Sequence, residues 1–145
     1  MSDRILVAYD GSPPARNALE FAFDEFPDAD VTALYVVEIP EGYLGVIDGP
    51  DISVPLTDKA REHADSVLEP ARALAAERGR DLETDVDSGK PDHRIVERAL
   101  EDDYETIVLG SHGRQAISRV VLGSVAERVV RRSPIPVAVV PYSSH

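Results

Sequence analysis

Short β-rich segments alternate with longer helical segments along the sequence, and this alternation constrains the fold more than any other feature. Residues 4–9 form a continuous apolar run, which is typical of a strand buried on both faces. Further strands are predicted at residues 31–37, 82–87, 106–109 and 136–140, and helices at residues 15–26, 58–78, 92–101 and 123–132. Such alternation favours a parallel sheet covered by helices.

Five parallel strands with right-handed crossovers form an open, doubly wound α/β sheet with helices on both faces. If the strand order is 3-2-1-4-5, the chain reverses direction between the first and fourth strands. Ligands of such sheets bind outside the carboxyl ends of the strands that flank the reversal. Those ends carry the sequences DGS at residues 10–12 and GSHG at residues 110–113. The expected crevice therefore coincides with two glycine-containing segments.

Length and composition narrow the class of protein. The 145 residues suit one domain with a buried core, so residues 1–145 are interpreted as a single domain. The apolar runs are short compared with the roughly 20 residues of a membrane span, and the first residues do not resemble a secretory leader. Cysteine is absent, which excludes disulfides, thiolate metal sites and cysteine catalysis. A cytoplasmic location is expected.

The charge balance is strongly acidic, with 27 acidic and 15 basic residues and a formal net charge of −12. This balance argues against nucleic-acid and anionic-membrane binding, because both need basic surface. Among the basic residues only Lys59 and Lys90 are lysines. A well-solvated acidic surface explains these counts in part, but so much like charge is better tolerated in a salt-rich cytoplasm. A halophilic origin is the preferred interpretation.

The segment after the fourth strand has the features of a phosphate site. Gly110 and Gly113 follow a strand, and glycines lacking a Cβ atom let backbone amides approach an anion closely. Gly123 and Ser124 open a helix, whose free N–H groups and positive dipole end attract phosphate. Arg114 is a candidate charge partner for the terminal phosphates. A single glycine is better explained as a turn, but the whole set favours nucleotide binding.

A family resemblance follows from this spacing. The pattern G-x2-G-x9-G-S at residues 110–124, with DGS at residues 10–12 and PIPV at residues 134–137, resembles the universal stress protein family over essentially the whole chain. The glycine spacing defines the ATP-binding branch of that family. The resemblance implies a sheet of order 3-2-1-4-5, ATP at the point of reversal, and a homodimer joined along the last strand, Val137–Val140.

The resemblance also implies roles for individual residues. The adenosine would lie against strand ends at Ala8, Tyr9, Asp10, Val36, Leu109 and Gly110. The phosphates would lie against Gly113, Gly123, Ser124 and Val125. Asp10 would meet the ribose or adenine, and Val36 would present its backbone to the base. Burial in the core is the competing explanation for Val36 and Leu109, and an ordinary turn is the competing explanation for Asp10.

These observations predict an ATP-binding stress-response or signalling protein whose nucleotide state alters its dimer or its partners. A slow ATPase or phosphotransferase at the same site is the alternative. Asp10 can hold Mg²⁺, but no second acid near the glycine loop is evident, and the P-loop motif is absent from the sequence. A flavin-type electron carrier is a third class, against which the lack of tryptophan counts weakly. Residues 38–55 are interpreted either as a functional flap or as a mobile insertion.

The excess of like charge predicts that salt stabilises the fold. Self-repulsion between charges is strong at 0.01 M salt, where the Debye length is about 30 Å, and weak at 1 M, where it is about 3 Å. The melting temperature followed by circular dichroism should therefore rise across this range of salt. A melting temperature that stays flat or falls with added salt would contradict the prediction.

Overall fold

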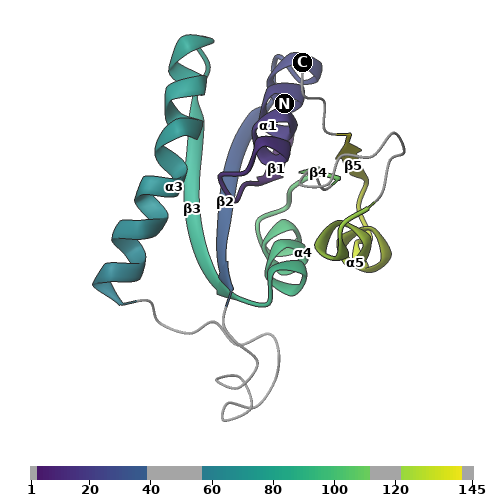
Figure 1. The fold of residues 1–145 in the computed structure, drawn as a ribbon. Helices are drawn as coiled ribbons and strands as arrows, with labels where there is room; N and C mark the ends of the chain where they lie inside the picture. The colour runs from purple at the N-terminus through teal and green to yellow at the C-terminus, as the bar shows by residue number, and fades with distance from the viewer. Residues whose placement is uncertain (1–2, 39–56, 112–121, 142–145) are drawn as a thin grey trace.

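The computed structural model describes residues 3–38, 57–111 and 122–141. Its five strands form one sheet of order β3-β2-β1-β4-β5, with every neighbouring pair parallel (Figure 1). This confirms the predicted doubly wound fold and its strand order. The elements are β1 (Arg4–Ala8), α1 (Pro13–Glu25), β2 (Asp30–Glu38), α3 (Asp58–Glu77), β3 (Leu82–Gly89), α4 (Pro91–Glu101), β4 (Thr106–Gly110), α5 (Ser124–Arg132) and β5 (Val137–Val140).

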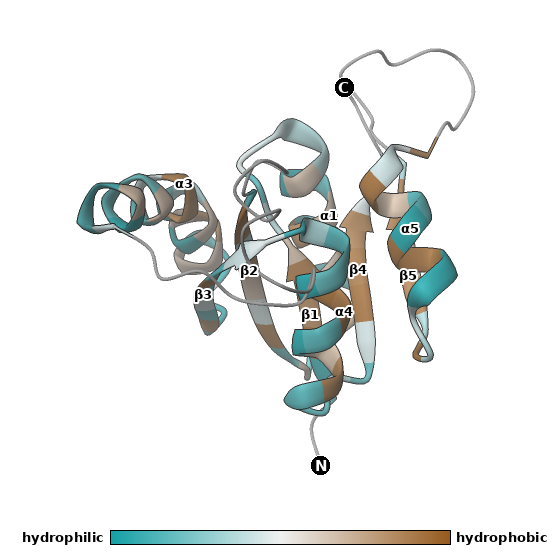
Figure 2. Ribbon diagram, turned by 90° about the horizontal axis from the view of Figure 1, so that it is seen from below, coloured by the Kyte–Doolittle hydropathy of each residue, from teal (hydrophilic) through white to brown (hydrophobic). Residues whose placement is uncertain are grey.

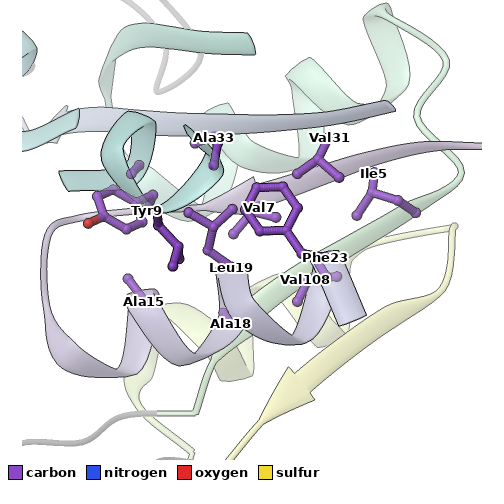
Figure 3. Packing of buried hydrophobic residues seen from close by; sticks show 14 of the residues in the cluster. Ile5, Val7, Tyr9, Ala15, Ala18, Leu19, Phe23, Val31, Ala33 and Val108 are labelled. Carbon is purple, nitrogen blue, oxygen red and sulfur yellow. The ribbon is translucent and has the colours of Figure 1, made fainter. Parts of the chain in front are cut away.

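The sheet buries apolar side chains on both faces because successive strand residues point to opposite sides. In β1, Ile5 and Val7 pack with α1 and α3, whereas Leu6 packs with α4 and α5. Figure 2 shows the apolar residues of β1 and β4 in the interior, and Figure 3 shows the first of these two cores from close by. None of the described helices combines the length and apolarity that crossing a membrane requires.

The helix ends in the structure lie close to the predicted ones, because capping residues, prolines and glycines determine them locally. Ser12 caps α1, since its hydroxyl accepts a hydrogen bond from Ala15 N at 3.3 Å, and two prolines occupy the first turn. Gly79 follows α3 with φ +63°, and Arg80 N donates to Ala75 O at 2.9 Å, which closes the helix in a Schellman motif. The observed bounds differ from the predicted ones by two residues at most.

Helix α4 is attached to β3 by ion pairs. Arg94 donates from Nε and Nη2 to Asp87 Oδ2 at 3.0 and 2.8 Å, and both side chains are buried. Arg98 bonds to Asp85 and to Asp102. Burial lowers the pKa of Arg98, but the hydrogen bond with Asp85 and the neighbouring carboxylates outweigh it and raise the pKa above its usual value. The guanidinium therefore stays charged in its half-buried position.

The buried hydroxyl of Tyr104 supplies a test of how the connection between α4 and β4 packs against β2. It donates to Thr32 Oγ1 at 2.8 Å, and both residues are about 5% exposed. Tyr104→Phe leaves the Thr32 hydroxyl without this partner, so we expect a loss of about 1–3 kcal/mol in the free energy of unfolding in urea. Thr32→Val combined with Tyr104→Phe should cost less than the sum of the single changes. Fully additive losses would contradict this coupling.

Candidate functional site

The connection from β1 to α1 is a tight turn built around Asp10. Ser12 donates to Asp10 Oδ1 from its backbone N at 3.0 Å and from its hydroxyl at 2.5 Å. Gly11 has φ +84°, a left-handed conformation that favours glycine, and a Cβ there would lie 3.3 Å from Val67 Cγ1. The carboxylate of Asp10 shapes the turn through these hydrogen bonds. Asp10 is also exposed, so it remains accessible at the strand end. The turn explanation and the ligand explanation of Asp10 are compatible.

The end of β4 lies directly against the start of α1. A Cβ added to Gly110 would come within 2.7 Å of the Pro14 carbonyl oxygen and of its Cβ, so only glycine fits this approach. The sequence predicts this glycine for close approach to a phosphate. The close approach that the structure shows is to the backbone of Pro14, which gives Gly110 a packing role as well.

Ser111 is a connecting residue that the sequence reasoning did not single out. Its N donates to Val140 O at 2.9 Å, and its O accepts from Gly123 N at 2.7 Å. It therefore ties the end of β4 both to the end of β5 and to the start of α5. Burial to 4% exposure holds its side chain in place. A serine after a strand carries no strong signal of this kind, because the role depends on backbone groups that every residue has.

Within the described residues, the start of α5 has no side-chain cap. Gly123 is the N-cap residue, with ordinary φ −69° and ψ 165°. Ser124 is exposed and Val125 is half-buried. The first N–H groups of a helix lack intrahelical partners, so this end attracts an anion. Gly113 and Arg114, the other predicted phosphate contacts, lie outside the described residues.

The residues expected around the adenosine divide into buried and accessible groups. Tyr9 is 4% exposed and its ring packs in the core shown in Figure 3, while its N donates to Leu34 O at 2.9 Å. Burial raises the pKa of Tyr9, so its phenol stays neutral. Leu109 is 3% exposed. Ala8 and Val36 are half-buried on the face covered by α4 and α5. Side-chain contact with a ligand is therefore restricted to the residues that are not fully buried, such as Ala8 and Val36. Tyr9 and Leu109 would contribute their backbones.

The strand register brings these segments together. Val7 pairs with Val108, so the residues that follow β1 and β4 emerge side by side, and Ser111 brings Gly123 to the same place. Val36 lies beyond Leu34, which pairs with Ala8, so β2 extends past the end of β1. The described part of the predicted site therefore forms one continuous edge at the point where the chain reverses.

Two surface hollows of the described residues lie elsewhere. One of about 340 Å³ lies among Arg4, Asp85, Arg98 and Tyr104, and one of about 230 Å³ lies between α3 and β3. Arg98 already bonds to acidic neighbours, and the guanidinium carbon of Arg4 lies 4.4 Å from the Tyr104 ring centre. Neither hollow includes a predicted site residue. The described residues also include no cluster of three or more histidine or acidic side chains suited to a metal ion.

The packing role of Gly110 is testable in the ligand-free protein. Gly110→Ala places a methyl group against the backbone of Pro14, so we expect the free energy of unfolding in urea to fall by about 1–3 kcal/mol. Circular dichroism at zero urea would check that the variant is folded. If the stability stays unchanged and only nucleotide binding falls, the packing role is wrong.

Comparisons with known proteins agree with this architecture. The sequence model of the universal stress protein family matches residues 1–141. The chain is 31% identical to Universal stress protein MJ0531 of Methanocaldococcus jannaschii, covering 94% of this chain and 81% of that protein. It is also 31% identical to Universal stress protein YxiE of Bacillus subtilis, covering 97% and 99%. The solved structure of hypothetical protein MJ0577 superposes with a TM-score of 0.73 at 27% identity, covering 100% and 99%. The chain belongs to the universal stress protein family.

Proposed function

We propose that this protein binds ATP at the carboxyl ends of β1 and β4 and acts as a nucleotide-dependent stress-response module of the cytoplasm. The observation that carries the proposal is the convergence at Ser111. Through its two backbone hydrogen bonds, the end of β4 meets the start of α5 beside the turn that follows β1. A glycine spacing suited to phosphate begins and ends at this junction.

The proposed roles follow from what each residue exposes. Asp10 offers a carboxylate to the ribose or adenine, and Val36 offers backbone groups to the base from the longer strand β2. The phosphates would meet the backbone donors of Gly123, Ser124 and Val125 at the start of α5. Gly113 and Arg114 complete the phosphate contacts on the strength of sequence spacing alone.

Structures of the same fold support an adenine nucleotide as the ligand class. One universal stress protein was solved in complex with cAMP, and it superposes with a TM-score of 0.66 at 24% identity. A family protein of Arabidopsis thaliana was solved with AMP bound, with the same TM-score at 15% identity. These likenesses concern the fold, so the choice of ATP rests on the residues of this chain.

Binding without rapid hydrolysis is the preferred form of the proposal. Phosphoryl transfer needs a positioned metal ion and a residue that orients the nucleophile. Asp10 is the residue that would hold Mg²⁺, yet its Oδ1 already accepts two hydrogen bonds from Ser12. A slow ATPase or phosphotransferase at the same site remains the alternative. We also propose a homodimer joined along β5, Val137–Val140, whose stability depends on the bound nucleotide.

The glycine loop predicts a ranking of ATP affinities in calorimetry. Gly113→Val introduces a branched side chain where the phosphates should lie and disfavours positive φ, so we expect binding to be nearly abolished. Ser124→Ala removes one hydrogen bond to a charged acceptor, which should cost about 1.5–3 kcal/mol of binding free energy. Arg131→Ala, in the last turn of α5 at the opposite end from the proposed phosphate contacts, serves as the control with wild-type affinity.

Two results would count against the proposal. If folded Gly113→Val binds ATP as tightly as the wild type, the loop is not the phosphate site. If the wild type turns ATP over at roughly 1–100 s⁻¹, as kinases do, the enzyme alternative replaces the binding proposal. The identity of any nucleotide released from the purified protein on denaturation would show which nucleotide it retains.

A further inference from the structure

Strand β3 forms the edge of the sheet opposite β5, so one side of its backbone has no neighbouring strand among the described residues (Figure 1). Tyr9 N donates to Leu34 O, so the even-numbered residues of β2 face β1. The odd-numbered residues of β2 therefore face β3, because backbone groups alternate sides along a strand. With Ala33 paired to Thr84, they bond to residues 83, 85 and 87. Residues 82, 84, 86 and 88 turn their backbone groups outward.

The outward groups of β3 are open in its first half. Val86 N donates to Asp85 Oδ1 at 2.9 Å, and Ser88 N donates to the carboxylate of the preceding residue at 2.8 Å. The outward N–H groups of Leu82 and Thr84 have no acceptor within the described ranges, and the C=O groups of residues 82, 84 and 86 have no donor there. An open row of this kind is a template for another strand.

Two surface hollows flank the open row, one on each face of the sheet. The larger, of about 340 Å³, lies on the face of α4, and the smaller, of about 230 Å³, lies on the face of α3. Both are lined by Thr84 and Asp85, in the middle of β3. Side chains of an added strand alternate between the two faces, so they would enter the two hollows by turns. Proteins that bind a peptide as an extra strand use such pockets for specificity.

The hollow on the face of α4 suits a positively charged side chain. Its charged lining residues are Arg4, Glu83, Asp85, Arg98 and Asp102. Arg98 lies within 4 Å of Asp85 and Asp102, and also 3.7 Å from the buried Asp87. Four carboxylates therefore surround two guanidinium groups. Glu83 is exposed and forms no ion pair with a described residue, so it is available to a cation.

The hollow on the face of α3 suits an aliphatic side chain. Leu68 and Val86 belong to its lining. Arg72 and Asp65, which also line it, are bonded to each other at 2.8 Å. Arg61 adds a further positive charge to the lining, which disfavours a cation there. The two hollows therefore differ in the side chains that they would accept.

We propose that β3 is a docking edge for an extended segment of another protein in which basic and aliphatic residues alternate. The basic side chains would enter the hollow on the face of α4 and the aliphatic ones the hollow on the face of α3. The backbone of the segment would bond to the open groups of residues 82–86. None of the residues assigned to the nucleotide takes part, so the proposal does not depend on the proposed function.

The charge of the chain favours such a partner over a second copy. Two β3 strands paired with each other would bring Glu83 and Asp85 of one copy against the same carboxylates of the other, and like charges on facing strands are destabilising. The formal net charge of −12 also attracts a basic segment and repels an identical chain.

Calorimetry with a synthetic peptide tests the chemistry of the partner. The probe is a capped peptide of about eight residues in which lysine and valine alternate. We expect Glu83→Lys to weaken its binding about five-fold or more, because the substitution places a cation in the hollow on the face of α4. Glu25→Lys, at the exposed end of α1, makes the same change of charge outside both hollows and should bind almost as the wild type does.

A folded wild type that does not bind the peptide overturns the proposal. Equal losses in Glu83→Lys and Glu25→Lys would also overturn it, because the attraction would then come from the overall charge. A peptide that alternates glutamate with valine should not bind, and binding of both peptides with the same affinity contradicts the proposed chemistry.

Two methylated forms of the peptide test strand addition itself. One carries N-methyl groups on all its lysines and the other on all its valines. In an added strand, alternate N–H groups face β3 and the others face solvent, so only one of the two forms should lose affinity, by about ten-fold or more. Equal affinities of the two forms would show that the peptide does not bind as a strand.

Amide hydrogen exchange locates the bound peptide. At saturating peptide, the outward N–H groups of Leu82 and Thr84 should exchange about ten-fold or more slowly than in the free protein. The N–H groups of Val86 and Ser88 should change less, because carboxylates already accept from them. Protection confined to β5 would place the peptide at the opposite edge and overturn the proposal.

Discussion

A parallel sheet has to bury both of its faces, and β1 meets this requirement at the centre of the structure. It lies between β2 and β4, and Ile5, Leu6 and Val7 are each at most 1% exposed. Because all five strands run the same way, their carboxyl ends lie at one edge of the sheet, and each connection must return over a face. The connections after β1 and β4 leave to opposite faces, which opens the edge between them. The location of the candidate site is therefore a consequence of how the core is buried.

Arginine side chains let an acidic chain fold compactly, because a guanidinium has five donors and can serve several carboxylates. Arg72 bonds to Asp65 and Glu69, and Arg98 lies within 4 Å of three carboxylates. The exposed pairs each contribute little to stability. The buried pair of Asp87 and Arg94 differs, because little solvent reaches either side chain to screen the attraction between them. This pair fixes α4 against the edge strand β3.

The elements and their order could be predicted from the sequence because apolar periodicity records which residues are buried. The alternation in residues 82–87 predicted β3, but it gave no sign that Asp85 and Asp87 face α4. The arginine partner of Asp85 lies 13 residues further along the chain and that of Asp87 lies 7 residues further, so the pairing exists only once strand and helix pack together.

The candidate site stays a prediction, although the structure shows how its described parts are arranged. The glycine spacing points to a place where two strand ends and a helix start meet, because all three lie at one edge of the sheet. It could not show that Gly110 approaches Pro14, since a glycine signals closeness without naming its neighbour. Ser111 went unpredicted because its contacts use only backbone groups. Gly113 and Arg114 lie outside the described residues, so their roles stay predictions.

Ser111 also connects the two parts of the proposed function. Its N is bonded to the last residue of β5, and its O is bonded to the residue that caps α5. A phosphate that draws the start of α5 toward itself would therefore act on the end of β5 through one buried residue. If nucleotide binding strengthens pairing along β5, linkage requires pairing to strengthen nucleotide binding by the same factor. The proposed dimer along β5 would place its interface at the edge that adjoins the proposed phosphate contacts.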